Sequence, residues 1–315
     1  MRERDGRRPA HADVYDPLMH PVRVGLKVSA QAISANDLLA VWRFADASGF
    51  DHIWGFDHFG PGVPYPASGD VYEGWTTLGA MAIATSRARI GLMVTGNTYR
   101  HPGVLAKMAV TVDHLSGGRL EFGIGAAWVE EEHTMFGLEF GTTSQRIERL
   151  RESVTAIKSL WTLPSTTLVG SHYVIREAYS DPKPVQTPHP PIWIGGAGER
   201  KTLRVVAELA DVWNMLRGDP SEAGRLSRVL DQHCADVGRP PTEIRRSIQI
   251  MMSPPEEARV TINKATGYLE EGFTEIILIV RSPEALRYAS VAAYEIAPAI
   301  RAAARKRGLA VEAQN

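Results

Sequence analysis

The amino-acid sequence predicts a parallel α/β fold, a (β/α)8 or TIM barrel with an insertion before its fifth strand. Short apolar or β-branched runs alternate with longer segments of helical period, and about eight such pairs follow one another along 315 residues. Alternating strand–helix units form a parallel sheet, and eight of them close into a barrel. The alternative is an open doubly wound sheet. That fold usually carries a glycine-rich turn after its first strand, where this chain has Ser29, Ala30 and Gln31.

The first half of the chain contains four predicted strand–helix pairs. The runs at 22–28, 51–56, 89–95 and 119–125 are rich in apolar and β-branched residues, which is typical of buried strands. Predicted helices follow them at 36–48, 74–85, 103–115 and 142–163. Ser34 or Asn36 is suited to cap the first helix, because a short polar side chain can accept a backbone N–H there.

The second half begins with a segment of a different kind. Residues 164–191 contain six prolines and no helical period, which predicts an excursion or a hairpin outside the main fold. Four more predicted strands follow at 192–195, 211–215, 246–252 and 275–280, with helices at 199–209, 220–237, 255–272 and 282–308. We predict a disordered N-terminal arm over 1–21 and a single barrel domain over 22–315.

Composition and charge exclude several functions. Lys and Arg number 35 and Asp and Glu 36, so the net charge of −1 lacks the basic surplus of a nucleic-acid binder. No apolar run approaches the roughly 18 residues of a membrane span, and the charged N-terminus lacks the apolar core of a signal peptide. The single cysteine, Cys234, fits a reducing compartment. We therefore predict a cytoplasmic protein that binds neither nucleic acid nor membranes.

Functional residues of a (β/α)8 barrel lie just past the C-terminal ends of its strands. Asp57 and His58 follow the second predicted strand. A histidine gains and loses a proton near neutral pH, and an adjacent carboxylate can orient its ring. We interpret this pair as catalytic. The alternative is a capping aspartate beside a surface histidine.

Three glycine-containing segments follow the next predicted strands. Gly96 follows the third predicted strand, and Gly125, Ala126 and Ala127 lie at the end of the fourth and just past it, where small residues leave room for a flat ring. The turn Gly195–Gly198 leads from the fifth strand into a helix. Backbone N–H groups at such a turn can bind an anion, and the alternative is a plain flexible turn.

The acidic run Glu130-Glu131-Glu132-His133 follows the fourth predicted strand. It lacks the spacing of a metal-binding helix, so we interpret it as the solvated start of a helix and predict no metal. The sequence also lacks a G-x-S-x-G elbow and a Walker A lysine loop, so nothing favours a serine hydrolase or a P-loop NTPase.

Over roughly residues 22–285 the sequence resembles the luciferase-like family of flavin and deazaflavin oxidoreductases, and within it the branch that uses coenzyme F420. The segments that carry the resemblance are Asp57-His58, Tyr99-Arg100-His101-Pro102, Leu105-Ala106-Lys107, Asp113, Leu115–Arg119, Gly123–Trp128, Glu132, Phe136-Gly137, Arg146, Arg149-Leu150, Pro191, Gly195–Glu199 and Ala210–Asn214.

The resemblance implies roles for these residues. The coenzyme ring rests on a bulge within Val94, Thr95, Gly96 and Asn97, often with a non-proline cis peptide. The turn Gly196-Ala197-Gly198 holds the coenzyme phosphate, and His58 exchanges a proton beside the reacting face of the ring. Sugar-phosphate dehydrogenases of this family carry a catalytic Glu where this chain has Trp128, which predicts an apolar or aromatic substrate.

The resemblance thus predicts hydride transfer between F420 and a small organic substrate. The alternatives are an FMN-dependent monooxygenase that needs oxygen and a partner reductase, and a barrel that binds a ligand without turnover. Family resemblance also implies a homodimer.

Overall fold

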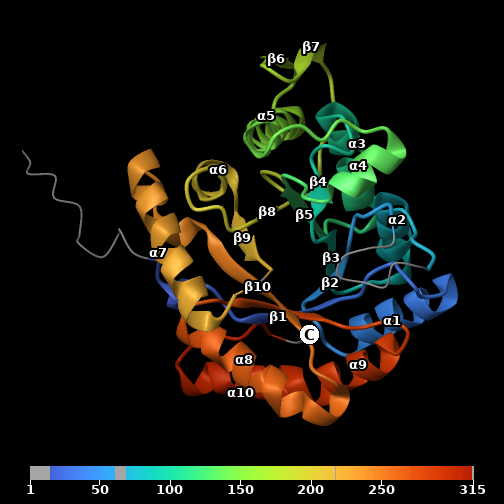
Figure 1. Ribbon diagram of the computed structural model, residues 1–315, viewed down its shortest axis with the longest axis vertical. Helices are drawn as coiled ribbons and strands as arrows, with labels where there is room; N and C mark the ends of the chain where they lie inside the picture. The colour runs from blue at the N-terminus through green and yellow to red at the C-terminus, as the bar shows by residue number, and fades with distance from the viewer. Residues whose placement is uncertain (1–14, 61–68, 217, 314–315) are drawn as a thin grey trace, which may run out of the picture.

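The computed structural model describes residues 15–60, 69–216 and 218–313. It confirms the predicted (β/α)8 barrel (Figure 1). Strands of one parallel sheet follow the order β3-β2-β1-β11-β10-β9-β8-β5-β4, and a further pairing of β3 with β5 closes the ring. Since β3 and β4 together occupy one position, the barrel has the eight strand positions that the sequence predicts.

The elements match the predicted ranges closely. The barrel strands are β1 (Arg23–Lys27), β2 (His52–Gly55), β3 (Arg89–Leu92), β4 (Thr95–Gly96), β5 (Leu120–Gly125), β8 (Ile192–Gly195), β9 (Val212–Met215), β10 (Arg245–Met251) and β11 (Glu275–Ile279). The α-helices are α1 (Ala35–Ala47), α2 (Gly74–Ala84), α3 (Pro102–Leu115), α4 (Glu130–Phe136), α5 (Thr143–Thr162), α6 (Thr202–Leu209), α7 (Pro220–Val237), α8 (Ala258–Glu270), α9 (Ala285–Val291) and α10 (Ala297–Lys306). Within the described ranges, no helix has the length and apolar character needed to cross a membrane.

The predicted third strand is broken in the structure. The peptide bond between Met93 and Val94 is cis, and it separates β3 from β4. Strand β4 continues the barrel by pairing with β5, with Thr95 opposite Ile124 and Gly96 opposite Gly125. The resemblance implies a bulge within residues 94–97, and the break lies at the edge of that segment.

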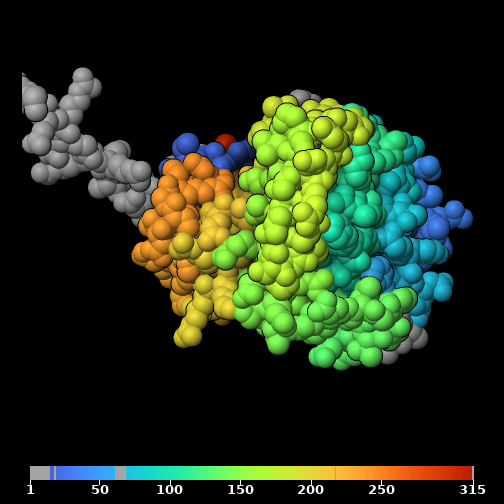
Figure 2. All heavy atoms as spheres, turned by 90° about the horizontal axis from the view of Figure 1, so that it is seen from above, coloured from blue at the N-terminus to red at the C-terminus, as the bar shows by residue number. Residues whose placement is uncertain are grey.

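The proline-rich insertion forms a hairpin, as predicted. Strands β6 (Thr166–Val169) and β7 (Val174–Ala178) are antiparallel and form a separate sheet. Figure 1 shows this hairpin beyond helix α5, away from the barrel strands, and the yellow-green band in Figure 2 shows the insertion on the outer surface.

Large side chains fill the barrel interior beneath the C-terminal strand ends. Trp54, Met93, Trp193, Val212 and Ile277 form a buried cluster, and Val94 packs against it. The barrel is therefore closed in its middle, and a ligand can enter only from an end.

Two predicted segments differ from the structure. The expected arm over 1–21 includes a 3-10 turn at Pro17–Met19, and Tyr15 is buried with its ring 4.3 Å from the guanidinium of Arg246. That aromatic–cation contact orders the chain from residue 15, whereas residues 1–14 lie outside the described ranges. The predicted final helix is two α-helices, α9 and α10, joined by a π-helical turn at Ala292–Ile296.

Candidate active site

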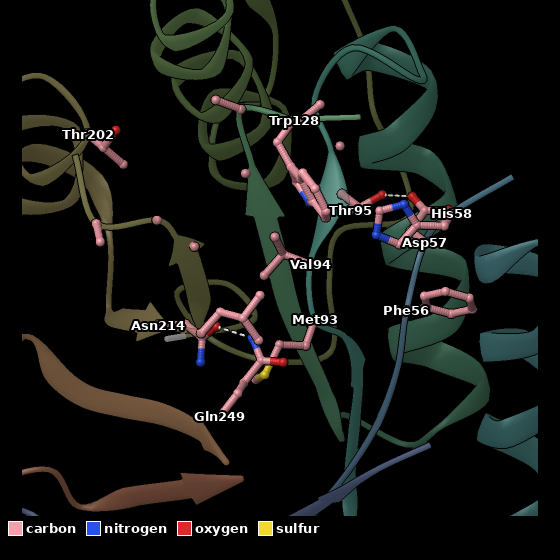
Figure 3. Close-up of a pocket in the computed structure, with 18 of the residues that line it drawn as sticks. Phe56, Asp57, His58, Met93, Val94, Thr95, Trp128, Thr202, Asn214 and Gln249 are labelled. Atoms are coloured by element: carbon pink, nitrogen blue, oxygen red, sulfur yellow. Dashed lines mark hydrogen bonds between the residues drawn. The ribbon is translucent and has the colours of Figure 1, made fainter. Parts of the chain in front are cut away.

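A cavity of about 610 Å³ opens at the C-terminal ends of the barrel strands. The side chains around it come from nearly every barrel strand or from the loop that follows it (Figure 3). This is the end of a (β/α)8 barrel where ligands bind. Most residues predicted as site residues line the cavity: Asp57, His58, Val94, Thr95, Gly96, Gly125, Ala126, Ala127, Trp128, Gly195, Gly196 and Ala197.

Asn97 and Gly198 are the two predicted residues that do not line the cavity. Asn97 is buried behind the wall, where its amide donates to the carbonyl of Arg146 at 3.2 Å. Gly198 lies one residue beyond the cavity edge and accepts from the backbone N–H of Leu203. Both residues make hydrogen bonds next to the cavity without lining it.

Val94 forms an apolar platform in the cavity wall. A Cβ atom added to Gly125 would lie 2.9 Å from Val94 Cγ2, and one added to Gly195 would lie 3.0 Å from the same atom. The side chain of Val94 therefore rests directly on two glycines of adjacent strands, β5 and β8. Glycine at these positions allows Val94 to lie flat against the barrel and leaves space above it for a planar ring.

The turn from β8 into α6 follows the predicted pattern. Gly196 has φ of +134°, which favours glycine, and a Cβ atom there would lie 2.9 Å from Thr202 Cγ2. Helix α6 begins at Thr202, three residues later than predicted, and the side chain of its N-cap residue Lys201 makes no capping hydrogen bond. The helix N-terminus thus adjoins a cavity-lining turn of small residues, an arrangement suited to an anion.

His58 is oriented by a carboxylate that the sequence did not assign to it. Its Nδ1 atom lies 2.9 Å from Oε2 of Glu132 in α4. Glu132 also accepts hydrogen bonds from the hydroxyl of Tyr99 at 2.6 Å and from the backbone N–H groups of Phe59 and Gly60 at 3.1 Å. The partly buried Glu132 therefore fixes the ring of His58 and the loop that follows it.

The charge on Glu132 is stable at neutral pH. Burial by itself raises the pKa of this carboxyl, but the hydrogen bond and charge of His58 and the hydrogen bond of Tyr99 lower its pKa to about 2. An ionised carboxylate only accepts hydrogen bonds, so Nδ1 of His58 carries its hydrogen and Nε2 is the nitrogen that can exchange a proton with a ligand.

Asp57 does not orient His58, contrary to the interpretation from sequence. Its carboxylate accepts from both terminal nitrogens of Arg100, at 2.6 and 3.0 Å, and from the hydroxyl of Thr95. Arg100 also pairs with Glu73 at the start of α2. Asp57 is almost fully buried, and its bonds tie the end of β2 to β4. Adjacent side chains on an extended segment point in opposite directions, which explains why the neighbour in sequence is not the partner.

The predicted solvated helix start is only partly solvated. Glu130 and Glu131 are exposed, whereas Glu132 and His133 are buried. His133 bonds to Thr98 at 2.7 Å through Nε2 and to the carbonyl of Val129 through Nδ1. Helical periodicity explains this split, since α4 must present one face to the barrel. In the part of the chain that the structure describes, no cluster of His, Cys, Asp and Glu is arranged to hold a metal ion.

The inner end of the cavity is polar. Lys27, at the end of β1, donates to the carbonyl of Met93 and to Oε1 of Gln249, both at 2.8 Å. Gln249 in turn donates to Asn214 at 2.7 Å (Figure 3). We call Lys27, Gln249 and Asn214 the polar floor. Burial lowers the pKa of Lys27 to about 7. All three residues belong to strands (β1, β9 and β10), so sequence reasoning that searched only past the strand ends missed Lys27 and Gln249.

The outer end of the cavity is aromatic and half exposed. Trp128 has an exposed fraction of 50%, and its ring centroid lies 6.1 Å from that of His58, nearly perpendicular to it (Figure 3). Arg146 lines the same wall but is held by the carbonyls of Ala126 and Gly141 and by the face of Phe140. Phe56 and Met251 add apolar surface.

The cavity at the mouth of this parallel barrel thus combines the apolar platform of Val94, a glycine turn before helix α6, and an imidazole oriented by Glu132. The family model described as luciferase-like monooxygenase matches residues 18–310. The chain belongs to this luciferase-like family, which confirms the resemblance found in the sequence.

Individual relatives agree with this assignment. An F420-dependent glucose-6-phosphate dehydrogenase of Microbacterium testaceum is 30% identical over 74% of this chain and 68% of its own length. Among solved structures, an F420-dependent secondary alcohol dehydrogenase aligns with a TM-score of 0.80, 19% identity, and 89% and 99% of the two chains. The F420-dependent tetrahydromethanopterin reductase of Methanopyrus kandleri aligns with a TM-score of 0.75, 16% identity, and the same coverage. At these identities the two structures support the fold alone.

Proposed function

We propose that the chain is an oxidoreductase that uses coenzyme F420 and transfers a hydride between it and a small, apolar organic substrate. The observation that carries the proposal is the convergence of three features in one cavity: the platform of Val94, the turn at Gly196, and the imidazole of His58. The dehydrogenase relative from Microbacterium testaceum is named for the same coenzyme.

The residues present fit a large planar coenzyme with a phosphate. Side chains at Gly125 and Gly195 would push Val94 into the space that a ring needs, so the glycines keep this cradle open. The backbone of Gly196 and Ala197 and the hydroxyl of Thr202 would hold the phosphate at the start of α6. When bound, the coenzyme supplies or accepts the hydride, and the protein supplies placement and a proton.

His58 would be the proton-transferring group. Its Nδ1 hydrogen is committed to Glu132, so a proton moves to or from the substrate at Nε2. Glu132 would stabilise the imidazolium that forms when Nε2 takes a proton. Asp57 would act indirectly. Its hydrogen bonds to Arg100 and Thr95 hold the end of β2, and the loop that follows β2 carries His58.

The mouth of the cavity favours an uncharged, apolar or aromatic substrate. Trp128 takes the position of the catalytic Glu of the sugar-phosphate dehydrogenases that the sequence resembles. Among the described residues, the cationic side chains that line the cavity are Lys27 and Arg146. Arg146, on the wall beside Trp128, is held by protein carbonyls, and Lys27 lies in the polar floor. A sugar phosphate would therefore find no ready partner for its charge beside Trp128.

An FMN-dependent monooxygenase is the second candidate function, and the description of the matching family as luciferase-like monooxygenase favours it. A paired fluorescence titration of the purified protein with oxidised F420 and with FMN decides between the two. Micromolar binding of F420 with much weaker binding of FMN supports the first proposal. The reverse preference, followed by oxygen consumption with a flavin reductase, supports the second. Binding of neither coenzyme contradicts both and removes the phosphate assignment of Gly196-Ala197-Gly198.

Turnover separates an enzyme from a barrel that only binds its ligand. Oxidation or reduction of bound F420 by a panel of small alcohols, ketones and enones under anaerobic conditions supports the enzyme. The same experiment shows the direction of hydride transfer. We further propose that the protein is cytoplasmic and forms a homodimer. Sedimentation of the full chain tests the homodimer.

A further inference from the structure

The polar floor contains a buried amine without a countercharge. The side chain of Lys27 is 8% exposed and lines the cavity. Its two hydrogen bonds go to a backbone carbonyl, that of Met93, and to a neutral amide, that of Gln249. Among the described residues, no carboxylate pairs with Lys27, whose two hydrogen-bond partners are both neutral. A buried lysine is ordinarily paired, so this arrangement needs an explanation.

The hydrogen bonds of the floor run in one direction. Gln249 accepts from Lys27 through Oε1, which leaves its amide nitrogen to donate to Asn214, and Asn214 donates to the hydroxyl of Ser247 at 2.9 Å. This chain fixes the orientation of the Gln249 amide and holds Lys27 in place. An ammonium has three donors and two are used, so the third N–H is available to an acceptor in the cavity.

We infer that Lys27 is the electrostatic partner of the reduced coenzyme and makes the protein bind that form more tightly than the oxidised form. This inference rests on the proposed function. An anionic or carbonyl group of the bound coenzyme would accept the third N–H of Lys27.

Charge balance supplies the reason. In the transfer, a C–H bond of the donor breaks, and its hydrogen moves with the electron pair to the ring, so the donor is oxidised and the ring is reduced. A hydride carries one negative charge, and the reduced ring keeps that charge unless it also takes up a proton. A cation close to this charge and shielded from water stabilises it far more than one in solvent. The buried ammonium of Lys27 lines the cavity and would supply that cation.

The test compares the dissociation constants of oxidised and reduced F420, measured anaerobically for the wild type and for Lys27→Met. We expect the ratio of the oxidised to the reduced constant to fall at least tenfold in the variant. For a two-electron couple a tenfold change corresponds to about 30 mV in the midpoint potential of the bound coenzyme, which a redox titration measures independently. Lys264→Met is the matched control, because it removes an exposed lysine of helix α8 that does not line the cavity; it should leave the ratio unchanged.

The dissociation constants of the wild type and of Lys27→Met distinguish a failure of this inference from a failure of the proposed function. If F420 binds and the ratio in Lys27→Met equals that of the wild type, Lys27 has no such role although the proposed function stands. If neither redox form binds the wild type, the proposed function fails first, and the inference falls with it. Should Lys27→Met not fold, Lys27→Gln, which keeps a donor for Met93 but no charge, decides in the same way.

Discussion

Nδ1 of His58 lies 2.9 Å from Oε2 of Glu132, a residue 74 positions further along the chain. The contact joins the loop after β2 to helix α4, and the same carboxylate accepts three further hydrogen bonds, from Tyr99, Phe59 and Gly60. Glu132 therefore positions the ring of His58, and in the proposed mechanism it would act on a substrate through that ring.

Glu132→Gln tests this role. A glutamine offers one acceptor oxygen to four donors and turns an NH₂ group toward at least one of them, so we expect turnover to fall about 10–100-fold and unfolding free energy to fall by about 1–3 kcal/mol. Steady-state kinetics and urea denaturation measure the two effects. Glu131→Gln, an exposed neighbour on the same helix, should change neither. If Glu132→Gln lost stability but kept full turnover, the carboxylate would be structural only.

His58→Ala should reduce turnover by about 10²–10⁴-fold while the dissociation constant of F420 stays within twofold. The reason is that, in the proposed mechanism, the imidazole exchanges a proton with the substrate, whereas the platform of Val94 and the turn at Gly196 hold the coenzyme. Fluorescence titration and stopped-flow reduction of the coenzyme separate the two readouts. Equal turnover in the variant would remove His58 from the mechanism.

The sequence predicts the barrel well because its signals are local. Alternation of strands and helices and the composition of 164–191 each depend on neighbouring residues, and the structure agrees with them. The glycine turns were also found, since the need for Gly125 and Gly195 arises within or at the end of a strand. Glu132 was recognised only as part of a family pattern, because its partner is distant in sequence. Lys27 gave no signal of its own, as one lysine at a strand end resembles a surface residue.

Gly195→Ala should weaken F420 binding at least tenfold. The added Cβ atom would lie 3.0 Å from Val94 Cγ2, which forces the valine toward the space above the platform. The double variant with Val94→Ala removes the obstructing methyl groups and should recover most of the affinity. Gly79→Ala in α2, where an added Cβ meets no atom within 4 Å, is the control and should bind normally. Equal weakening in the single and double variants would show that Val94 does not transmit the effect.

Lys27 should make stability depend on pH above neutrality. Burial lowers the pKa of Lys27 to about 7 in the folded protein, against an ordinary value of 10.5. Between these two values the unfolded chain holds a proton that the folded chain does not, so the free energy of unfolding rises with pH, by up to about 1.4 kcal/mol per pH unit. Below pH 7 both states are protonated, and the contribution of Lys27 is constant.

The comparison of wild type with Lys27→Met isolates this effect, because all other titrating groups are shared. The pKa of Lys27 is about 7 in the folded protein and 10.5 in the unfolded chain. We therefore expect the difference in unfolding free energy, wild type minus variant, to be flat from about pH 5 to 6.5 and to rise from about pH 7 to about pH 10. Urea denaturation at fixed pH measures it, and the difference for Lys201→Met, an exposed lysine, should stay flat throughout. A flat difference for Lys27→Met as well would mean that the buried amine keeps its proton in the folded protein. The cavity would then present a permanent ammonium to its ligand, and the electrostatic role of Lys27 would not depend on pH over this range.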